Sequence, residues 1–203
     1  MNLRSLPTQL TWVRIVIIPL FLIVHYCSND WLSMNTKDIM LSAIFTMAGV
    51  TDYFDGYLAR KWKQESNFGA FLDPVADKAL VITTLITLLD LKRINILIAI
   101  IIILREMAVS ALREWSARKQ NFNLLNVSKL GKWKTGLQMT AIGLLLWNCP
   151  LINVGNVNIF GYEVGNMSFG TLQIGTLLIW AAVFLTVYSF VGYVKQMMFM
   201  FRE

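Results

Sequence analysis

Long apolar stretches separated by short polar segments run along most of the chain. A helix needs about 20 apolar residues to cross the hydrocarbon layer of a membrane, and six stretches approach that length. The predicted spans are residues 9–28, 37–60, 69–91, 94–117, 132–149 and 171–194. The pattern therefore predicts an all-α integral membrane protein with six transmembrane helices. No room is left for a soluble domain, so residues 1–203 are expected to form a single membrane domain.

Composition supports this prediction, because 56% of the 203 residues are hydrophobic and only 15% are charged. Such a chain is too apolar for a soluble domain of this length. The apolar run that begins at Leu10 is predicted to be the first span rather than a cleaved signal peptide, since no small-residue cleavage site follows it. The segment 150–170, rich in Gly and Asn, is expected to be either an outer loop or a re-entrant piece.

Basic residues divide unequally between the two ends of the predicted spans. One set of ends collects Lys37, Lys92 and Arg93, and the other collects the remaining fifteen of the 18 Lys and Arg residues. Those fifteen are Arg4, Arg14, Arg60, Lys61, Lys63, Lys78, Arg105, Arg113, Arg118, Lys119, Lys129, Lys132, Lys134, Lys195 and Arg202. The positive-inside rule therefore places both termini and the second and fourth connections in the cytoplasm. The net charge of +6 suits anionic lipid headgroups. No nucleic-acid partner is expected, because the basic residues flank spans and form no soluble basic face.

Four aspartates interrupt the second and third apolar stretches. They follow one ordered pattern, Asp52-x-x-Asp55-Gly-x-x-Ala-Arg, then eight residues, then Gly-x-x-x-Asp73-x-x-x-Asp77. Ionisable residues at membrane depth are costly and mark candidate functional sites. The four carboxylates are therefore the first candidates for chemistry.

Helical spacing brings these acidic positions onto two matching faces. Residues three, four and seven apart share one face of a helix. The shared positions are Asp52, Asp55, Gly56 and Ala59 on the first helix and Gly69, Asp73 and Asp77 on the second. Asp52 and Asp77 each lie eight residues from the cytoplasmic turn, about 12 Å at the rise of an α-helix. An antiparallel hairpin is expected to bring the four carboxylates together.

Clustered carboxylates need a cation or shared protons, because like charges ~4 Å apart repel by ~4 kcal/mol at an effective dielectric constant of 20. Oxygen-only ligands suit Mg²⁺, Mn²⁺ or Ca²⁺ and disfavour zinc. Four carboxylates are enough for two ions that share ligands, an arrangement that assists phosphoryl transfer. Two other readings stay open: the aspartates are the ion site of a small transporter, or polar contacts of a membrane scaffold. A transporter predicts an inverted repeat, and the aspartate pattern has no second copy.

The whole pattern resembles the signature of the CDP-alcohol phosphotransferases, membrane enzymes of phospholipid synthesis. All eight defining positions match: Asp52, Asp55, Gly56, Ala59, Arg60, Gly69, Asp73 and Asp77. Further similarity at residues 10–14, 105–114 and 128–135 resembles the bacterial branch that makes phosphatidylglycerophosphate. The resemblance covers residues ~6–140 and departs at Thr8, where relatives often carry Asn.

The resemblance implies phosphatidyl transfer from CDP-diacylglycerol to sn-glycerol 3-phosphate, giving phosphatidylglycerophosphate and CMP in the bacterial inner membrane. It implies a homodimer with two divalent ions, Mg²⁺ or Mn²⁺, held by Asp52, Asp55 and Asp73. Asp77 at the edge of that metal site is implied as a further ligand and as the general base. The residues implied for CDP binding are Asp52, Gly56, Ala59, Arg60 and Gly69.

The phosphate of the acceptor needs a basic pocket of its own. Arginine binds phosphate through two parallel hydrogen bonds, and six basic residues reach the cytoplasmic half of the predicted bundle. They are Arg14, Arg105, Arg113, Lys129, Lys132 and Lys134. Arg105, Lys129 and Lys134 are expected to form most of the pocket, with Glu106 pairing with a neighbouring arginine. Contact with lipid headgroups is the alternative for each residue, and inositol phosphate, serine or a second lipid remain open as acceptors.

Three smaller features complete the expectations. Cys27 and Cys149 fall at the non-cytoplasmic ends, and we expect inert thiols, with a disulfide as the alternative. His25 lies near the same face and is expected to be structural or interfacial. Gly136 and Thr140 have the spacing of small residues that allow close helix packing within or between chains.

Overall fold

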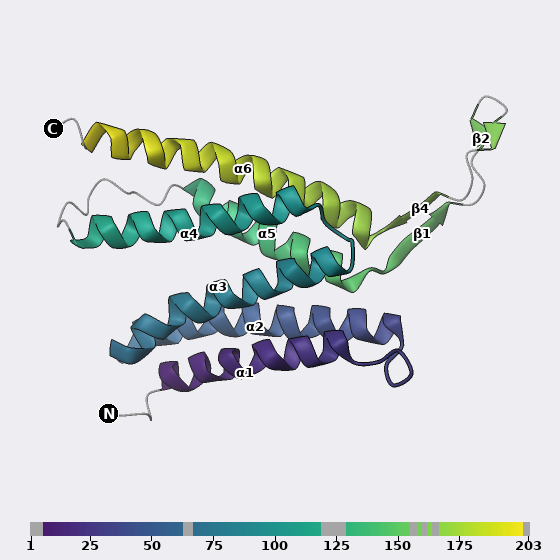
Figure 1. Ribbon diagram of the computed structural model, residues 1–203, viewed down its shortest axis with the longest axis horizontal. Coiled ribbons are helices and arrows are strands. Elements are labelled where there is room, and N and C mark those ends of the chain that lie inside the picture. The colour runs from purple at the N-terminus through teal and green to yellow at the C-terminus, as the bar shows by residue number, and fades with distance from the viewer. Residues whose placement is uncertain are drawn as a thin grey trace.

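Six helices lie side by side in the computed structural model of the chain (Figure 1). Among the described residues they are α1 Leu6–Tyr26, α2 Met34–Trp62, α3 Asn67–Asp90, α4 Ile96–Arg118, α5 Lys129–Trp147 and α6 Thr171–Met200. The structure describes the backbone of residues 6–62, 67–118, 129–154, 158–159, 162–163 and 167–200. Side chains are described within residues 15–51, 75–76, 78–112, 134–151 and 170–192.

Each predicted apolar span falls on one of these helices, so the predicted number and order of helices are confirmed for the described chain. Helix α1 begins and α6 ends at the same end of the bundle, as an even number of antiparallel helices requires (Figure 1). Within the described residues, one helical stretch, Thr171–Gly192, is by itself long and apolar enough to cross a membrane. Six membrane spans therefore remain a prediction.

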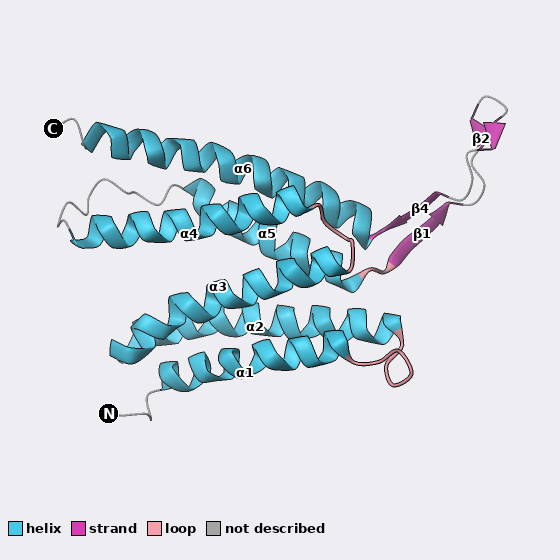
Figure 2. Ribbon diagram, viewed as in Figure 1, coloured by secondary structure: helices cyan, strands magenta, loops and turns pink. Residues whose placement is uncertain are grey.

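The described parts of the 150–170 segment form short strands (Figure 2). Strand β1, Pro150–Val154, pairs antiparallel with β4, Met167–Gly170, and the register shifts between Pro150 and Ile152. Strand β2, Asn158–Ile159, pairs with β3, Tyr162–Glu163. The paired strands extend the chain beyond one end of the bundle, which we call the hairpin end (Figure 1).

Packing is closest between α5 and α6. A Cβ added at Gly175 of α6 would lie 2.8 Å from the Leu145 side chain and 3.2 Å from its backbone nitrogen on α5. Glycine therefore allows these two helices to approach closely. Helix α1 packs against α2 and α3, and α5 also packs against α2. Large buried side chains fill the interior, among them Phe21, Phe45, Leu85, Ile102, Leu146 and Ile179.

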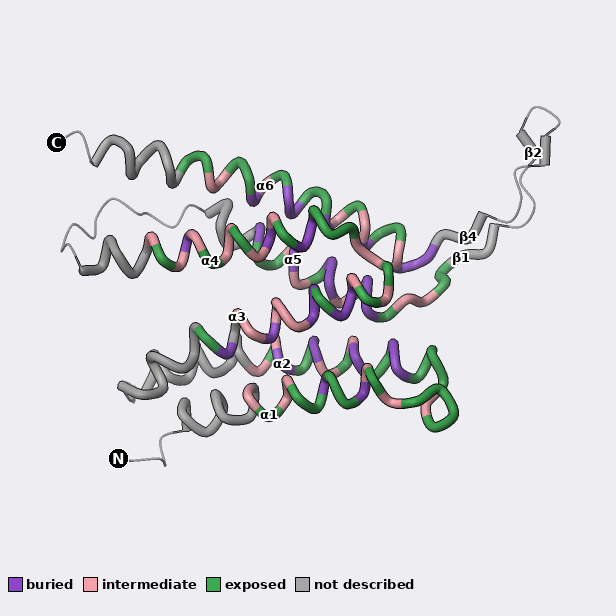
Figure 3. Tube along the Cα trace, viewed as in Figure 1, coloured by how far each residue is buried: buried purple, intermediate pink, exposed green. Residues whose placement is uncertain are grey.

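Each helix has both buried and exposed residues among those described (Figure 3). Apolar side chains are exposed on every helix, including Ile23, Met47, Ile86, Leu104, Trp147 and Phe184. Polar side chains are buried, including Lys37, Asp38, Lys134, Gln138 and Thr186. Charged groups are rarely buried in soluble proteins unless they are paired. The outer surface of this bundle suits apolar surroundings.

Three side chains tie the helices together at the hairpin end, and we call Asp38, Arg93 and Asn148 the hairpin-end clamp. Arg93 donates to both carboxylate oxygens of Asp38, at 2.7 and 2.6 Å. It also donates to the last carbonyls of α5, those of Leu145 at 3.0 Å and Leu146 at 2.8 Å. Asn148 Nδ2 donates to Asp38 at 3.1 Å. A cation at a helix C-terminus satisfies carbonyls that lack partners within the helix.

Two further contacts fix the end of α1. Lys37 donates to Asn29 Oδ1 at 2.7 Å and to the carbonyl oxygen of Cys27. His25 Nε2 lies 2.8 Å from Asp90 Oδ2 at the end of α3, which supports the structural reading of His25. Cys27 and Cys149 are both free thiols, as expected.

Candidate active site

The signature aspartates lie on α2 and α3, in the parts of both helices that adjoin their connection. Asp52 and Asp55 fall in the second half of α2, and Asp73 and Asp77 fall in the first half of α3. The side chains of these four residues lie outside the described part of the chain. Their convergence on a metal ion therefore stays a prediction.

Several other predicted site residues have described backbone positions only. Gly56, Ala59 and Arg60 lie on α2, Gly69 on α3, Arg14 on α1, Arg113 on α4, and Lys129 and Lys132 on α5. Their side chains lie outside the described residues. Their roles in nucleotide or phosphate binding remain predictions.

A buried charged cluster joins α4 and α5, and we call it the Arg105–Glu106–Lys134 cluster. Lys134 Nζ lies 3.1 Å from Glu106 Oε1, and Arg105 Nη1 lies 3.4 Å from the same oxygen. The Lys134 side chain is only 1% exposed, whereas that of Glu106 is 32% exposed. Arg105 Nη2 lies 3.5 Å from Ser189 Oγ on α6. The structure thus brings Arg105 and Lys134 together, and the expected pairing of Glu106 with an arginine is confirmed.

The cluster brings two basic side chains together in a largely buried position. Both Arg105 and Lys134 lie within ion-pair distance of Glu106. Burying a charge away from water is costly unless it is paired. Arginine and lysine side chains also form strong hydrogen bonds with phosphate, so the cluster has side chains of the type that a phosphate-binding site uses.

Helix α3 adjoins this cluster. Lys78, which directly follows Asp77 in the chain, lines a small cavity together with Glu106 and Met107 of α4. The cavity has a volume of about 20 Å³, which is enough for about one water molecule. The basic cluster and the acidic segment of α3 are therefore neighbours, as a shared reaction site requires.

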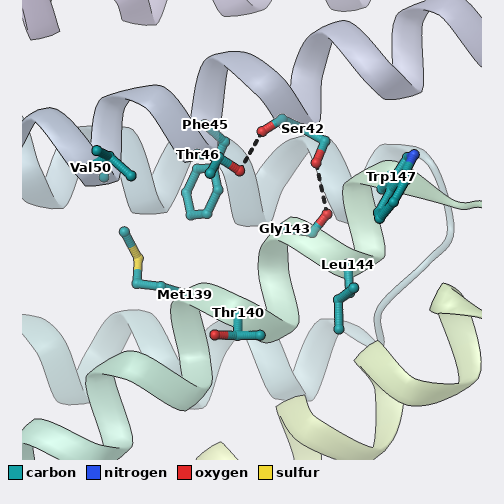
Figure 4. Close-up of a pocket in the computed structure, with 10 residues that line it drawn as sticks. Ser42, Phe45, Thr46, Val50, Met139, Thr140, Gly143, Leu144 and Trp147 are labelled. Atoms are coloured by element: carbon teal, nitrogen blue, oxygen red, sulfur yellow. Dashed lines mark hydrogen bonds between the residues drawn. The ribbon is translucent and has the colours of Figure 1, made fainter.

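An apolar groove of about 570 Å³ runs between α2 and α5 (Figure 4). Met139 extends toward Val50 at one end, and Trp147 lies at the other (Figure 4). Ser42 Oγ bridges the helices by donating to the carbonyl oxygen of Gly143 at 3.1 Å. The groove approaches the acidic segment along α2, because Val50 lies only two residues before Asp52.

Two polar features were missed by the sequence patterns. The sequence assigned Arg93 and Lys37 only to the less basic ends of the predicted spans, yet both are largely buried and bound to other side chains. Gln138 on α5 and Thr186 on α6 are also buried and were not singled out. The available signal for Gln138 was its spacing of four residues from Lys134, which places both on one face of α5.

Gly136 and Thr140 do not pack within the described chain. A Cβ added at Gly136 would meet nothing within 4 Å of it there, and Thr140 is exposed and donates to the Gly136 carbonyl oxygen at 2.9 Å. Close packing at these residues between two chains stays a prediction.

Comparisons with known proteins show which family the sequence resembles. Residues 4–188 match the family described as CDP-alcohol phosphatidyltransferase. A protein of Haemophilus influenzae named CDP-diacylglycerol–glycerol-3-phosphate 3-phosphatidyltransferase is 46% identical over 145 residues, 70% of this chain and 76% of that protein. Proteins with the same name in Wigglesworthia glossinidia brevipalpis and Escherichia coli are 46% and 43% identical, over 70% of this chain and 77% of each relative.

Proposed function

The chain belongs to the CDP-alcohol phosphatidyltransferase family, and we propose that it transfers the phosphatidyl group of CDP-diacylglycerol to sn-glycerol 3-phosphate. The products are phosphatidylglycerophosphate and CMP, which places the enzyme in phospholipid biosynthesis. One observation carries the proposal: Lys78, which follows the signature residue Asp77 on α3, lines the same small cavity as Glu106 of the Arg105–Glu106–Lys134 cluster. The names of the similar relatives support the same reaction.

The reaction exchanges one phosphorus–oxygen bond for another. The primary hydroxyl oxygen of the acceptor bonds to the phosphorus that carries diacylglycerol, and the bond from that phosphorus to the CMP oxygen breaks. Asp77 accepts the hydroxyl proton as the general base. Phosphoryl transfer depends mainly on in-line positioning and on stabilisation of oxygen charge, so the arrangement of the two substrates is the main task of the chain.

Divalent cations fit the chemistry of the signature residues. Asp52, Asp55, Asp73 and Asp77 offer oxygen ligands only, the set preferred by Mg²⁺ and Mn²⁺, and they would hold two ions. When bound, such ions neutralise charge on the diphosphate. The aspartates would therefore hold divalent cations beside the diphosphate of the CDP group.

Each substrate has a surface of matching chemistry. The acceptor phosphate binds beside Arg105 and Lys134, because that cluster brings two basic side chains together in a largely buried position. Gly56, Ala59 and Arg60 approach the cytidine diphosphate. The apolar groove between α2 and α5 holds one acyl chain of CDP-diacylglycerol, since it is apolar and leads along α2 toward Asp52.

The same function requires a membrane location. Exposed apolar side chains on all six helices and buried polar groups within the bundle support six spans. The reaction then lies in the cytoplasmic half, with both termini on that side. The family resemblance also implies that two copies of the chain form a homodimer.

Release of CMP tests this proposal directly. Purified protein in detergent is given CDP-diacylglycerol with glycerol 3-phosphate, inositol phosphate or serine in separate reactions. We expect rapid CMP release with glycerol 3-phosphate, its loss with a chelator, and its recovery with Mg²⁺ or Mn²⁺. Turnover with another alcohol but not with glycerol 3-phosphate would overturn the acceptor, and nucleotide-independent metal flux in vesicles would instead indicate an ion carrier.

A further inference from the structure

The apolar groove between α2 and α5 is lined by hydroxyl groups that already have backbone partners. Ser42 Oγ donates to the carbonyl oxygen of Gly143 at 3.1 Å. Thr46 Oγ1 donates to the carbonyl oxygen of Ser42 at 2.8 Å, and Thr140 Oγ1 to that of Gly136 at 2.9 Å. A polar occupant would have to compete for hydroxyls that are already bonded, whereas a hydrocarbon chain needs no partner. The chemistry of these walls therefore favours a hydrocarbon chain.

Exposure at both ends makes this groove accessible from outside the bundle. Val50 is 51% exposed at one end, and Trp147 is 43% exposed at the other. Phe45, which also lines the groove, belongs to the buried core. A lipid chain can thus enter sideways from the surrounding membrane and pack against the core along one side.

Two glycines give the groove its width. Gly49 lines it from α2 and Gly143 from α5. A Cβ added at Gly143 would lie 3.8 Å from Thr46 Oγ1, which is an ordinary contact. One added at Gly49 would lie 3.2 Å from Met139 Cε. A small side chain at Gly143 is therefore compatible with the fold, whereas a larger one would extend into the groove.

Met139 lies at the end of the groove nearer the signature aspartates. Its side chain extends from α5 toward Val50 (Figure 4), and its terminal methyl lies next to Gly49. Gly49 precedes Asp52 by three residues, about 4.5 Å along the helix. Methionine is unbranched and flexible, so it adapts to a chain that packs beside it. Because α2 continues from the groove into the signature, a chain of the donor suits this groove better than a helix of a second copy.

We propose that Met139 and Gly143 position one acyl chain of the donor in this groove and give the enzyme a preference for long chains. This inference rests on the proposed function, in which the donor diphosphate lies at the signature aspartates. The chain then runs along α2 past Met139 and reaches Gly143 only if it is long enough. Thr46, which faces Gly143, precedes Asp52 by six residues, about 9 Å along the helix. A donor with four-carbon chains ends before that point.

Donors of two chain lengths isolate this contact. CDP-dipalmitoylglycerol and CDP-dibutyrylglycerol carry the same headgroup, and each variant is compared with the wild type on each donor. In Gly143→Leu the added side chain takes the space of the acyl chain, so kcat/KM for the dipalmitoyl donor should fall at least ~10-fold. Met139→Ala removes packing against the chain and should lower the same value about 3- to 10-fold. Both variants should keep kcat/KM for the dibutyryl donor, and KM for glycerol 3-phosphate, within about twofold of wild type.

Matched variants separate chain binding from a structural role. Gly192→Leu makes the same change on α6, where an added Cβ would meet nothing within 4 Å among the described residues, so both donors should react as in the wild type. Met139→Leu keeps an apolar side chain of similar volume and should restore the dipalmitoyl value. If Gly143→Leu does not fold, as judged by thermal unfolding in detergent, Met139→Ala and Met139→Leu carry the test.

Three outcomes would overturn the inference. The first is an equal loss on both donors in Gly143→Leu and Met139→Ala, which would indicate a structural role. The second is an unchanged kcat/KM for the dipalmitoyl donor in both variants. The third is a loss that accompanies dissociation of an oligomer, measured by chemical crosslinking, which would indicate that a second copy occupies the groove. Absence of CMP release by the wild-type protein with either donor and glycerol 3-phosphate would instead remove the proposed function itself.

Discussion

The two ends of the helix bundle bury polar groups in opposite ways. At the hairpin end, Arg93 is bound by Asp38 and by two backbone carbonyls, so its charge and donors are satisfied within the chain. Toward the other end, Arg105 and Lys134 both contact Glu106, and the buried oxygens of Gln138 and Thr186 have no hydrogen-bond partner in the described chain. The satisfied cluster holds the helices together. The incomplete one is suited to a ligand.

Two aspartates of helix α3 test this comparison, because they lie toward opposite ends of the bundle. Asp77 is the expected general base, and Asp90, at the hairpin end of the same helix, pairs with His25. Because general base catalysis contributes about 10²- to 10⁴-fold, Asp77→Asn should lower kcat by that factor while nucleotide binding persists. Asp90→Asn should leave kcat within about twofold, since a largely exposed ion pair contributes little. Steady-state kinetics of CMP release measures kcat for both variants. Similar losses of kcat in the two variants would contradict the claim that only the Asp77 end takes part in the reaction.

The hairpin-end clamp should carry the largest stability effect. Arg93→Met leaves the Asp38 carboxylate buried without its cation and two α5 carbonyls without a donor. Breaking a buried ion pair in this way costs about 3–5 kcal/mol of unfolding free energy. Thermal unfolding in detergent checks the value. Lys92→Met, at the neighbouring exposed residue, is the matched control and should change the unfolding free energy by less than about 0.5 kcal/mol.

Two buried lysines sharpen the contrast further. Lys134→Met removes a charged donor from the proposed phosphate site, and hydrogen bonds to charged groups contribute about 1.5–3 kcal/mol. The kcat/KM for glycerol 3-phosphate should therefore fall by about 10- to 100-fold, mainly through KM. Lys37→Met at the hairpin end should lower the thermal unfolding temperature and leave KM at its wild-type value. A raised KM for glycerol 3-phosphate in Lys37→Met would contradict the claim that the hairpin end has a structural role and does not bind the substrate.

The smallest effect is expected at His25. Its partner Asp90 is 61% exposed, and such ion pairs contribute about 1 kcal/mol or less. His25→Gln should lower the unfolding free energy by no more than that amount and leave the acceptor KM unchanged. Thermal unfolding and acceptor titration test both statements, and a change in KM would link the hairpin end to the reaction.

The sequence predicted the helices because membrane-length apolar runs are a strong local signal. The span predicted at 69–91 corresponds to α3, Asn67–Asp90. The pairing of β1 with β4 was not predicted, because the strands are short and lack an alternating pattern. Helix α6 extends beyond its predicted span to Met200, since helical hydrogen bonding continues past the point where the apolar run weakens.

Long-range partners could not be read from the pattern. Arg93 and Asp38 are 55 positions apart, and Lys134 and Glu106 are 28 apart. Net charge near helix ends orients the chain but does not say which side chains meet. The signature aspartates were recognisable because their spacing alone defines a face, whereas Gln138 and Thr186 gain meaning only from burial without partners.

Transfer of labelled glycerol 3-phosphate into lipid tests the central claim most directly. The purified protein is incubated with CDP-diacylglycerol, radiolabelled sn-glycerol 3-phosphate and Mg²⁺, and label in the chloroform phase is compared with CMP formed. We predict one labelled phosphatidylglycerophosphate for each CMP. Release of CMP while the label stays in the aqueous phase would contradict the account, because the chain would then hydrolyse the donor rather than transfer its phosphatidyl group.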